Sequence, residues 1–439
     1  MNFKSDFLKE FYERGFFAAT THEKELDFLL ANEKVTVYIG FDCTAKSLHA
    51  GSLIQIMILR LLQKHGHKPL VLLGGGTTKI GDPSGKDEAR QVLNNQQILE
   101  NLTGIKKILE KFITFGGGAS NAVLVNNDDW LKQLNYIDFL REVGRHFSIN
   151  RMLSFDSVKL RLEREQPLSF LEFNYMILQA YDFYELNQKY NCRLQIGGSD
   201  QWGNIINGVE LTRRIAAAKE AKNTNSEGSG SPLFKGGRAD ALAPRGLHQD
   251  KYEVFGLTSP LLTTSDGKKM GKTANGAVWL DENMLSAFDY FQYFRNIADA
   301  DIGKFLRLFT DLEIAEIEKL EKLQDQEINK AKEILAFEAT KICHGENKAN
   351  EVLQKAREIF ISKNSDAFEE LNGNLNEKLI DVVFASNAFE SRGAIKKLIE
   401  GKAVKIDGET ILNIHQILEK SGEFELKIGK KNFFKLIVK

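Results

Sequence analysis

A strand, a helix and a second strand follow one another near the N-terminus, and this order constrains the fold more than any other feature. Residues 34–41 (KVTVYIGF) are short and β-branched, residues 51–66 (GSLIQIMILRLLQKHG) have the apolar periodicity of a helix closed by Gly66, and residues 68–77 (KPLVLLGGGT) are again apolar. Such a connection joins two parallel strands through a right-handed crossover. The segment therefore predicts a βαβ unit.

The same alternation recurs further along, at residues 121–127 (NAVLVNN), in a helix from about residue 129, and at residues 192–198 (CRLQIGG). It predicts an α/β fold class, a doubly wound parallel-sheet (Rossmann-like) domain over residues 1–285. Ligands of such sheets bind at the carboxyl ends of the strands. Three glycine-containing polar segments fall there, at residues 40–52, 74–85 and 196–204.

The rest of the chain changes character several times. Residues 221–251 are rich in Gly, Ser, Asn and charge, which predicts a flexible surface insertion, with a partner-binding loop as the alternative. Apolar spacings of three and four predict an all-helical domain over 286–361. A polar linker is expected at 362–378 and a small α+β module at 379–439, where Asp407-Gly408 signals a hairpin.

Composition excludes some functions. The 59 basic and 60 acidic residues nearly cancel, so contact with nucleic acid requires a local patch rather than global attraction. The three cysteines are far apart, which disfavours a zinc site and fits a reducing cytosol. Neither a signal peptide nor a run of roughly 18 apolar residues is found, so we expect a cytoplasmic protein with no membrane partner.

Residues 47–52 (SLHAGS) and 265–273 (SDGKKMGKT) are candidates for phosphate binding. Gly51 at a helix start exposes amides to an anion, and His49 and Ser52 can donate hydrogen bonds. Glycines around Lys269 and Lys272 allow these ammonium groups to close on a polyphosphate. Each segment also has an interpretation without a ligand: residues 47–52 as an ordinary helix cap, and residues 265–273 as a solvated basic turn.

A polar stripe lies on the otherwise apolar helix expected at residues 170–190. Tyr175, Gln179 and Asp182 are spaced so that they share one face. Polar groups on a buried helix need partners. The stripe is therefore either an internal hydrogen-bond network or the wall of a pocket for a polar ligand.

These segments occur together and in one order: YIGFDCTAKSLHAGS, GDPSGK, the Tyr-Gln-Asp helix, QIGGSDQWGN and KKMGKT. Together they resemble class I aminoacyl-tRNA synthetases, specifically the bacterial type of tyrosyl-tRNA synthetase, over nearly the whole chain. QIGGSDQWGN is the most specific segment. KKMGKT is similar to the KMSKS signature, and HAGS is a degenerate HIGH signature with Ser52 in place of its second histidine.

The resemblance implies a role for individual residues. Tyr38 and Asp182 match the pair that binds the phenol of tyrosine, an arrangement that excludes phenylalanine because both partners would be left unpaired. The remaining matches are Asp82, Tyr175 and Gln179 at the ammonium group, Gln201 near the substrate and the ribose, Gly40, Asp42, Thr44, His49, Gly51, Gly198 and Asp200 around ATP, and Lys86, Arg90, Lys269, Lys272 and Thr273 on the leaving pyrophosphate.

The resemblance also implies the reaction and the partners. L-tyrosine and ATP, the latter with magnesium, form tyrosyl-adenylate, and tyrosine is transferred to tRNA(Tyr). No metal bound by the protein itself is expected. The family is a homodimer whose interface is an insertion near residues 130–160. From residue 375 onward the chain contains 12 basic and 9 acidic residues. The tRNA-binding candidates in this module are Arg392, Lys396, Lys397, Lys402 and Lys405.

Three other interpretations remain open. A tryptophanyl enzyme shares the sheet, but Asp182 opposite Tyr38 and the terminal module favour tyrosine. A small-molecule adenylyltransferase would not need the helical domain or the module. An RNA-binding paralogue with a decayed site is suggested by HAGS, whereas the intact KKMGKT segment and Asp82 argue against decay.

Overall fold

The structure is a computed structural model that describes residues 2–84, 93–226, 253–265, 267, 270, 272–273, 276–358, 368–386, 388–389, 391–429 and 432–439. For residues 157, 220–226, 272, 273 and 369 only the backbone is described. The chain divides into two compact units. The first comprises residues 1–271, 279–284 and 297–331, and the second residues 272–278, 285–296 and 332–439.

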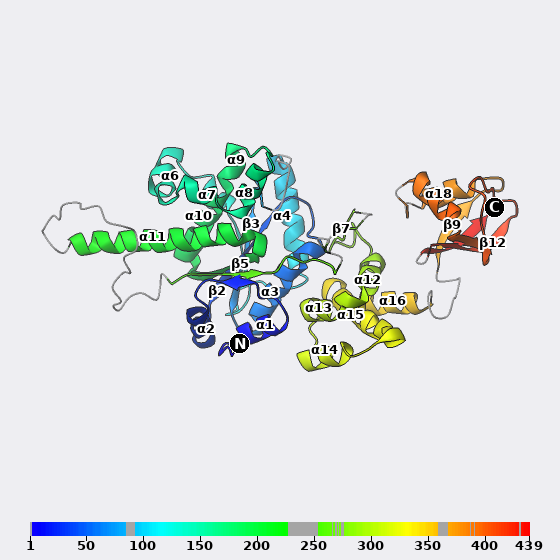
Figure 1. Ribbon diagram of the computed structural model, residues 1–439, viewed down its shortest axis with the longest axis horizontal. Coiled ribbons are helices and arrows are strands. Elements are labelled where there is room, and N and C mark those ends of the chain that lie inside the picture. The colour runs from blue at the N-terminus through cyan, green and yellow to red at the C-terminus, as the bar shows by residue number, and fades with distance from the viewer. Residues whose placement is uncertain are drawn as a thin grey trace. The chain divides into compact units, whose positions relative to one another are not determined.

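A six-stranded sheet in the order β1-β6-β5-β2-β3-β4 organises the first unit (Figure 1). Its strands are β1 (Ala19–Thr20), β2 (Thr36–Asp42), β3 (Lys68–Gly74), β4 (Val123–Asn126), β5 (Cys192–Gly198) and β6 (Phe255–Ser259). All neighbours are parallel except the edge pair β1–β6. The predicted doubly wound α/β fold is confirmed, and the predicted strands agree with β2 to β5 within a few residues.

Helices cover both faces of this sheet (Figure 1). The helices α1 (Asp6–Glu13), α2 (Glu23–Asn32) and α3 (Leu53–Lys64) lie toward one side, and α10 (Tyr175–Tyr190) and α11 (Trp202–Ser226) toward the other. Tyr38 and Leu72 of the sheet pack with Phe183 of α10 and Val209 of α11 in one buried cluster. Because side chains alternate along a strand, the intervening residues, such as the buried Val37, face the opposite layer.

Helix α4 (Asn95–Leu109) and a group of short helices complete this part of the unit. Helix α4 precedes β4, and α5 (Asp128–Leu131), α6 (Tyr136–Glu142), α7 (Ile149–Met152), α8 (Asp156–Glu163) and α9 (Phe170–Phe173) connect β4 to α10. Gly66 ends the turn after α3 with φ +78°, as expected of a C-terminal cap. Helix α11 continues to Ser226, so the predicted insertion begins at least six residues later than residue 221, and residues 227–252 lie outside the described residues.

The predicted boundary at residue 285 is wrong in part. The helices α13 (Ile302–Phe309) and α14 (Ile314–Leu320) belong to the first unit. The reason is Arg14 of α1, whose guanidinium donates to the carbonyl oxygens of Arg307, Thr310 and Leu312 at 3.1, 3.0 and 2.9 Å. These three buried or half-buried hydrogen bonds attach the segment to the N-terminal helix.

The second unit contains α12 (Ala287–Arg295), α16 (Glu346–Arg357) and most of α15 (Ile328–His344), so the predicted helical character is confirmed. It also contains the hairpin β7 (Lys272–Thr273) and β8 (Gly276–Ala277). No helix in the described part of the chain has the length and apolar character needed to cross a membrane.

The C-terminal residues form a five-stranded sheet in the order β11-β10-β12-β13-β9 with α17 (Leu379–Ala385) and α18 (Arg392–Glu400). The strands are β9 (Glu369–Gly373), β10 (Val404–Ile406), β11 (Glu409–Thr410), β12 (Gly422–Ile428) and β13 (Asn432–Val438). Asp407 and Gly408 form the predicted hairpin turn with φ +48° and +86°. The predicted linker at 362–378 is wrong for residues 369–373, because β9 pairs in parallel with β13 and buries Leu371.

Candidate active site

A cavity of about 420 Å³ lies at the carboxyl ends of β2, β3 and β5. Parallel strands end at the same edge, so polar residues that follow different strands meet there. Fourteen of the residues singled out from the sequence line this cavity: Tyr38, Gly40, Asp42, Thr44, His49, Gly51, Ser52, Asp82, Tyr175, Gln179, Asp182, Gly198, Asp200 and Gln201.

Asp182 is buried on α10 at one end of the cavity and is held by two donors. The indole Nε1 of Trp130 donates to its Oδ1 at 2.7 Å, and Nδ2 of Asn127 donates to its Oδ2 at 2.9 Å. Burial raises the pKa of Asp182 to about 7, while the two donors act in the opposite direction. This end of the cavity can therefore accept a hydrogen bond from a neutral polar group.

Tyr38 of β2 faces the same end. Its hydroxyl is buried and has no hydrogen-bond partner among the described residues, and its pKa is raised well above the ordinary value by burial. An unsatisfied buried hydroxyl costs about 1–3 kcal/mol. A ligand hydroxyl between Tyr38 and Asp182 would satisfy the first group and donate to the second.

Amide side chains and a carboxylate form a second group in the cavity. Nε2 of Gln201 donates to Oδ2 of Asp82 at 2.8 Å, and Nδ2 of Asn204 donates to Gln179 and Gln201 at 3.0 and 3.1 Å. The backbone N–H of Ser84 donates to Oδ1 of Asp82 at 2.9 Å. The group presents carboxylate and amide oxygens, which suit a cationic amine.

Asp42 at the end of β2 links the polar helix to the loop after β3. The hydroxyl of Tyr175 donates to Oδ2 of Asp42 at 3.0 Å, and Thr77 Oγ1 donates to Oδ1 at 2.8 Å. Asn127 Nδ2 donates to the hydroxyl oxygen of Thr77 at 3.0 Å, so a continuous set of hydrogen bonds joins Asp42 to Asp182. The polar stripe is thus both an internal network and a cavity wall, and the two alternatives coexist.

The segment from Ser47 to Ser52 forms the opposite end of the cavity. His49 precedes the short helix η1 (Ala50–Ser52), and its Nδ1 accepts the backbone N–H of Gly51 at 3.0 Å. A Cβ on Gly51 would lie 2.7 Å from His49 Cε1 and 3.2 Å from the carbonyl oxygen of Met270. Glycine is therefore required here by the imidazole ring that closes over it.

The loop before His49 is fixed by α4. The side chain of Asn101 donates to the carbonyl oxygen of Cys43 at 2.8 Å, and Thr78 accepts the backbone N–H of Cys43 at 2.7 Å. A Cβ on Gly104 would lie only 2.0 Å from the carbonyl oxygen of Lys46. This contact brings the helix against the loop that carries Thr44.

Sequence reasoning missed four residues of this site: Asn127, Trp130, Gln195 and Asn204. Asn127 directly follows β4 at the same sheet edge, which is a signal that could have found it. Gln195 lies within β5, is buried and lines the cavity, and its Oε1 has no partner among the described residues. Trp130 gives no signal of its own, because an aromatic residue in a short helix is ordinarily core.

Some predicted residues cannot be placed at the cavity. Lys86, Arg90 and Lys269 lie outside the described residues, and for Lys272 and Thr273 only the β7 backbone is described. In the C-terminal module Lys396, Lys397, Lys402 and Lys405 are exposed. Arg392 differs from them, because it donates to Asp381 at 2.7 Å and its guanidinium lies 4.4 Å from the ring of Phe384.

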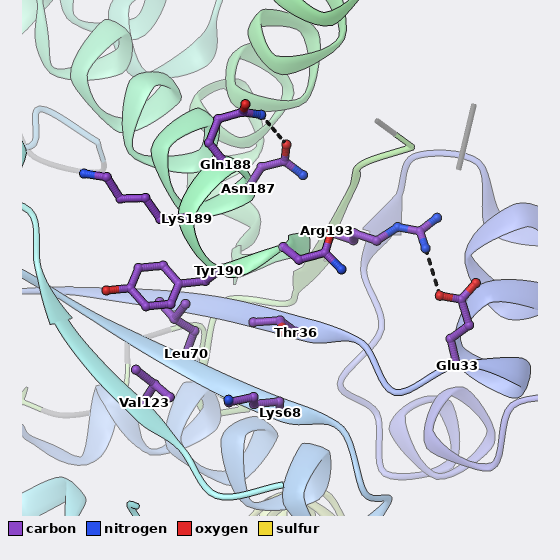
Figure 2. A pocket seen from close by; sticks show the side chains of 11 residues that line it. Glu33, Thr36, Lys68, Leu70, Val123, Asn187, Gln188, Lys189, Tyr190 and Arg193 are labelled. Carbon is purple, nitrogen blue, oxygen red and sulfur yellow. Dashed lines mark hydrogen bonds and ion pairs between the residues drawn. The ribbon is translucent and has the colours of Figure 1, made fainter. Parts of the chain in front are cut away.

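A larger hollow of about 780 Å³ lies at the other edge of the sheet, at the amino ends of the strands (Figure 2). Two of its cations are already paired, Arg193 with Glu33 at 3.0 Å and Lys189 with Glu185 at 2.8 Å. Its size exceeds that of the first cavity, but none of the residues singled out from the sequence as site candidates is among its lining residues. We therefore place the candidate active site at the carboxyl edge.

Within the described ranges no three His, Cys, Asp or Glu side chains form a group suited to a metal ion.

Comparison with known proteins gives a consistent result. The family described as tRNA synthetases class I (W and Y) matches residues 30–361. A tyrosine–tRNA ligase of Ehrlichia ruminantium (strain Welgevonden) is 52% identical over 448 aligned positions, covering 100% of this chain and 99% of the relative. A counterpart of Wolbachia pipientis (strain wPip) is 51% identical with the same coverage.

Solved structures agree with these relatives. A C-terminally truncated Aspergillus nidulans mitochondrial tyrosyl-tRNA synthetase superimposes with a TM-score of 0.67 at 30% identity, covering 81% of this chain and 94% of that one. The corresponding Coccidioides posadasii enzyme gives 0.63 at 32% identity, covering 79% and 91%.

Proposed function

Because this chain belongs to the family of class I tRNA synthetases for tryptophan and tyrosine, we propose that the cavity between Tyr38 and His49 is where it activates its amino acid. The chain is a tyrosine–tRNA ligase, with tyrosine, ATP and tRNA as its substrates. The roles assigned to individual residues below are part of the proposal.

The observation that carries it is the pairing of a partnerless buried hydroxyl with a buried carboxylate. The Tyr38 hydroxyl donates to the phenol oxygen of tyrosine, and the phenol donates to Asp182. Phenylalanine would leave both groups unpaired, which costs about 1–3 kcal/mol for each group. This arrangement selects tyrosine by hydrogen bonding rather than by size.

The substrate ammonium group occupies the centre of the cavity. Asp82, Tyr175, Gln179 and Gln201 surround it, and Asn204 orients the two glutamines through its hydrogen bonds to both. Anchoring tyrosine at the phenol and at the ammonium group places its carboxylate toward the ATP end.

ATP occupies the end formed by His49 and the ends of β2 and β5. Gly40, Asp42, Thr44, His49 and Gly51 form the loop around ATP, in which His49 and the backbone amides donate to the phosphates, and Gly198 and Asp200 lie at the ribose; all seven line the cavity. The tyrosine carboxylate attacks the α-phosphorus and pyrophosphate leaves. The attacking group is already ionised, so positioning and stabilisation of phosphate charge suffice.

The leaving pyrophosphate is neutralised by cationic side chains. We assign this role to Lys86, Arg90, Lys269 and Lys272, with the Thr273 hydroxyl as a hydrogen-bond donor, on the basis of the sequence resemblance alone. Magnesium would accompany ATP as its counter-ion and would stabilise negative charge on the phosphate oxygens.

The partners of the chain follow from two surfaces. Tyr136, Ile137 and Ile149, in the segment 130–160, are 59, 66 and 60% exposed, and this apolar surface supports a homodimer. Met152, in the same segment, is buried in the core and does not belong to this surface. The exposed side chains of Lys396, Lys397, Lys402 and Lys405 support contact with tRNA.

The three cysteines are buried and none forms a disulfide, which supports a cytoplasmic location.

Tyrosine-dependent exchange of labelled pyrophosphate into ATP, without tRNA, tests the proposal. We expect exchange with tyrosine and not with phenylalanine or tryptophan. Tyr38→Phe should lower the discrimination against phenylalanine by about 10-fold or more, because it removes one of the two phenol partners. Unchanged discrimination in this variant would contradict the assignment of Tyr38, and exchange with tryptophan would contradict that of the whole pocket.

A further inference from the structure

The imidazole of His49 is fixed at one nitrogen by its own backbone. Nδ1 accepts the N–H of Gly51 at 3.0 Å, so in the neutral ring the proton resides on Nε2. Nε2 is therefore the donor that the ring can offer to a phosphate oxygen. One hydrogen bond defines the tautomer, but it does not by itself prevent the ring from tilting about that bond.

Trp279 contacts the same ring from a segment more than two hundred residues away. The indole and imidazole centroids are 6.1 Å apart with an interplanar angle of 68°, an edge-to-face arrangement. His49 and Trp279 also form an antiparallel backbone bridge, and the N–H of Leu280 donates to the carbonyl oxygen of Leu48 at 3.0 Å. Both residues line the candidate active site.

The segment that carries Trp279 is itself firmly anchored. Its neighbours Val278 and Leu280 are buried, and Lys111 Nζ donates to the carbonyl oxygen of Leu280 at 3.2 Å. The backbone at Trp279 is thus held by hydrogen bonds on both sides of the bridge to His49. This fixes the position from which the indole reaches the imidazole.

We propose that Trp279 is a positioning residue for His49, which holds the imidazole with Nε2–H directed toward the phosphates of ATP. The inference rests on the phosphate-binding role proposed for His49. Trp279 does not need to touch the reacting atoms, since its effect passes through the ring of His49. It would therefore influence the chemical step and not the binding of tyrosine.

The substitution of the second signature histidine gives this contact more weight. Ser52 occupies that position, and its side chain makes no capping hydrogen bond to the start of α3. The Ser52 hydroxyl is shorter than an imidazole and is never charged. His49 therefore supplies the single imidazole of this motif. The contacts of this single ring with the backbone of Gly51 and with the indole of Trp279 both bear on its orientation.

A double-mutant cycle of Trp279→Leu and His49→Ala tests the inference in the full-length chain. Rates of pyrophosphate exchange are measured at saturating tyrosine and ATP, together with the KM for tyrosine and the melting temperature. We expect His49→Ala to lower the rate ~100-fold, as for loss of one oriented donor, and Trp279→Leu ~10-fold. In the His49→Ala background Trp279→Leu should have no further effect.

Trp279→Phe is the matched variant, since it keeps an aromatic edge at the same place. It should retain most of the wild-type rate, and the KM for tyrosine should be unchanged in all these variants. Equal losses from Trp279→Leu with and without His49 would overturn the inference, as would a parallel rise in the tyrosine KM. A negligible effect of His49→Ala would instead refute the proposed phosphate role of His49, which is a separate outcome.

Discussion

The indole Nε1 of Trp130 donates a hydrogen bond of 2.7 Å to Oδ1 of Asp182, and both side chains are buried. The carboxylate that we assign to tyrosine recognition is thereby oriented by a residue from a different helix, α5. Asn127 supplies the second donor and also reaches Thr77. Recognition of the phenol thus depends on groups that do not contact it.

Trp130→Phe should raise the KM for tyrosine about 10-fold with a smaller change in kcat. The substitution preserves an aromatic ring but removes the donor, leaving Asp182 with one hydrogen bond and a less defined orientation, worth about 1–2 kcal/mol. Pyrophosphate exchange over a range of tyrosine concentrations measures it. A KM equal to that of the wild type would show that Asn127 alone orients Asp182.

Stability should depend on pH through Asp182. Burial raises its pKa from 3.8 to about 7, so between these values the folded protein keeps a proton that the unfolded chain has released. Ionisation of the folded group is disfavoured, and stability must therefore fall as the pH rises through this window, by at most about 4 kcal/mol. Asp182→Asn should lack this component.

The measurement compares melting temperatures of the wild type and Asp182→Asn across the same pH range. The difference between the two proteins should shift in favour of the variant as the pH rises. Parallel curves would mean that Asp182 ionises at an ordinary pKa in the folded protein.

Gly104→Ala should raise the KM for ATP several-fold while leaving the KM for tyrosine unchanged. The new Cβ would lie 2.0 Å from the carbonyl oxygen of Lys46, a backbone atom, so the loop carrying Thr44 must move. Gly117→Ala is the control, because a Cβ there meets nothing within 4 Å. Equal effects on both substrates would indicate general destabilisation instead of a local displacement.

Ile137→Asp and Ile149→Asp should convert a dimer into monomers. Each substitution replaces an apolar side chain, which is 66 or 60% exposed in the single chain, by a charged one that the interface would have to bury. Phe28→Asp serves as the control, since Phe28 is 62% exposed but lies on α2, outside the segment 130–160. Light scattering at micromolar concentration distinguishes the states, and dissociation by Phe28→Asp alone would move the interface to α2.

The lysines of the C-terminal module should differ from its arginine in tRNA binding. The double variant Lys396→Ala/Lys397→Ala should bind tRNA more weakly, and its binding should depend less on salt. The slope of log K against log[salt] should fall in magnitude by ~0.8 for each phosphate that a lysine no longer neutralises. Arg392→Ala should mainly lower the stability of the module, because Arg392 is engaged with Asp381 and Phe384. An unchanged salt slope in the double lysine variant would exclude α18 as the contact surface.

Periodicity determined the element types and the fold class, because an α/β alternation has few ways to bury its apolar faces. The strand ends also indicated which polar segments meet at the carboxyl edge of the sheet, and the family resemblance then named the individual residues there. The strand β9 was missed because its sequence, EELNG, is polar and has no apolar alternation. Its pairing with β13 makes it part of the sheet.

By itself the sequence identified the residues to which we assign the chemistry, namely Tyr38, His49 and Asp182, through the resemblance of its motifs to those of a known family. The tertiary structure alone decided what orients them. Trp130 reaches Asp182, and Trp279 reaches His49, across 52 and 230 positions of sequence, respectively. Such contacts depend on how separate elements pack, and a pattern of local periodicity contains no information on which distant side chains will meet.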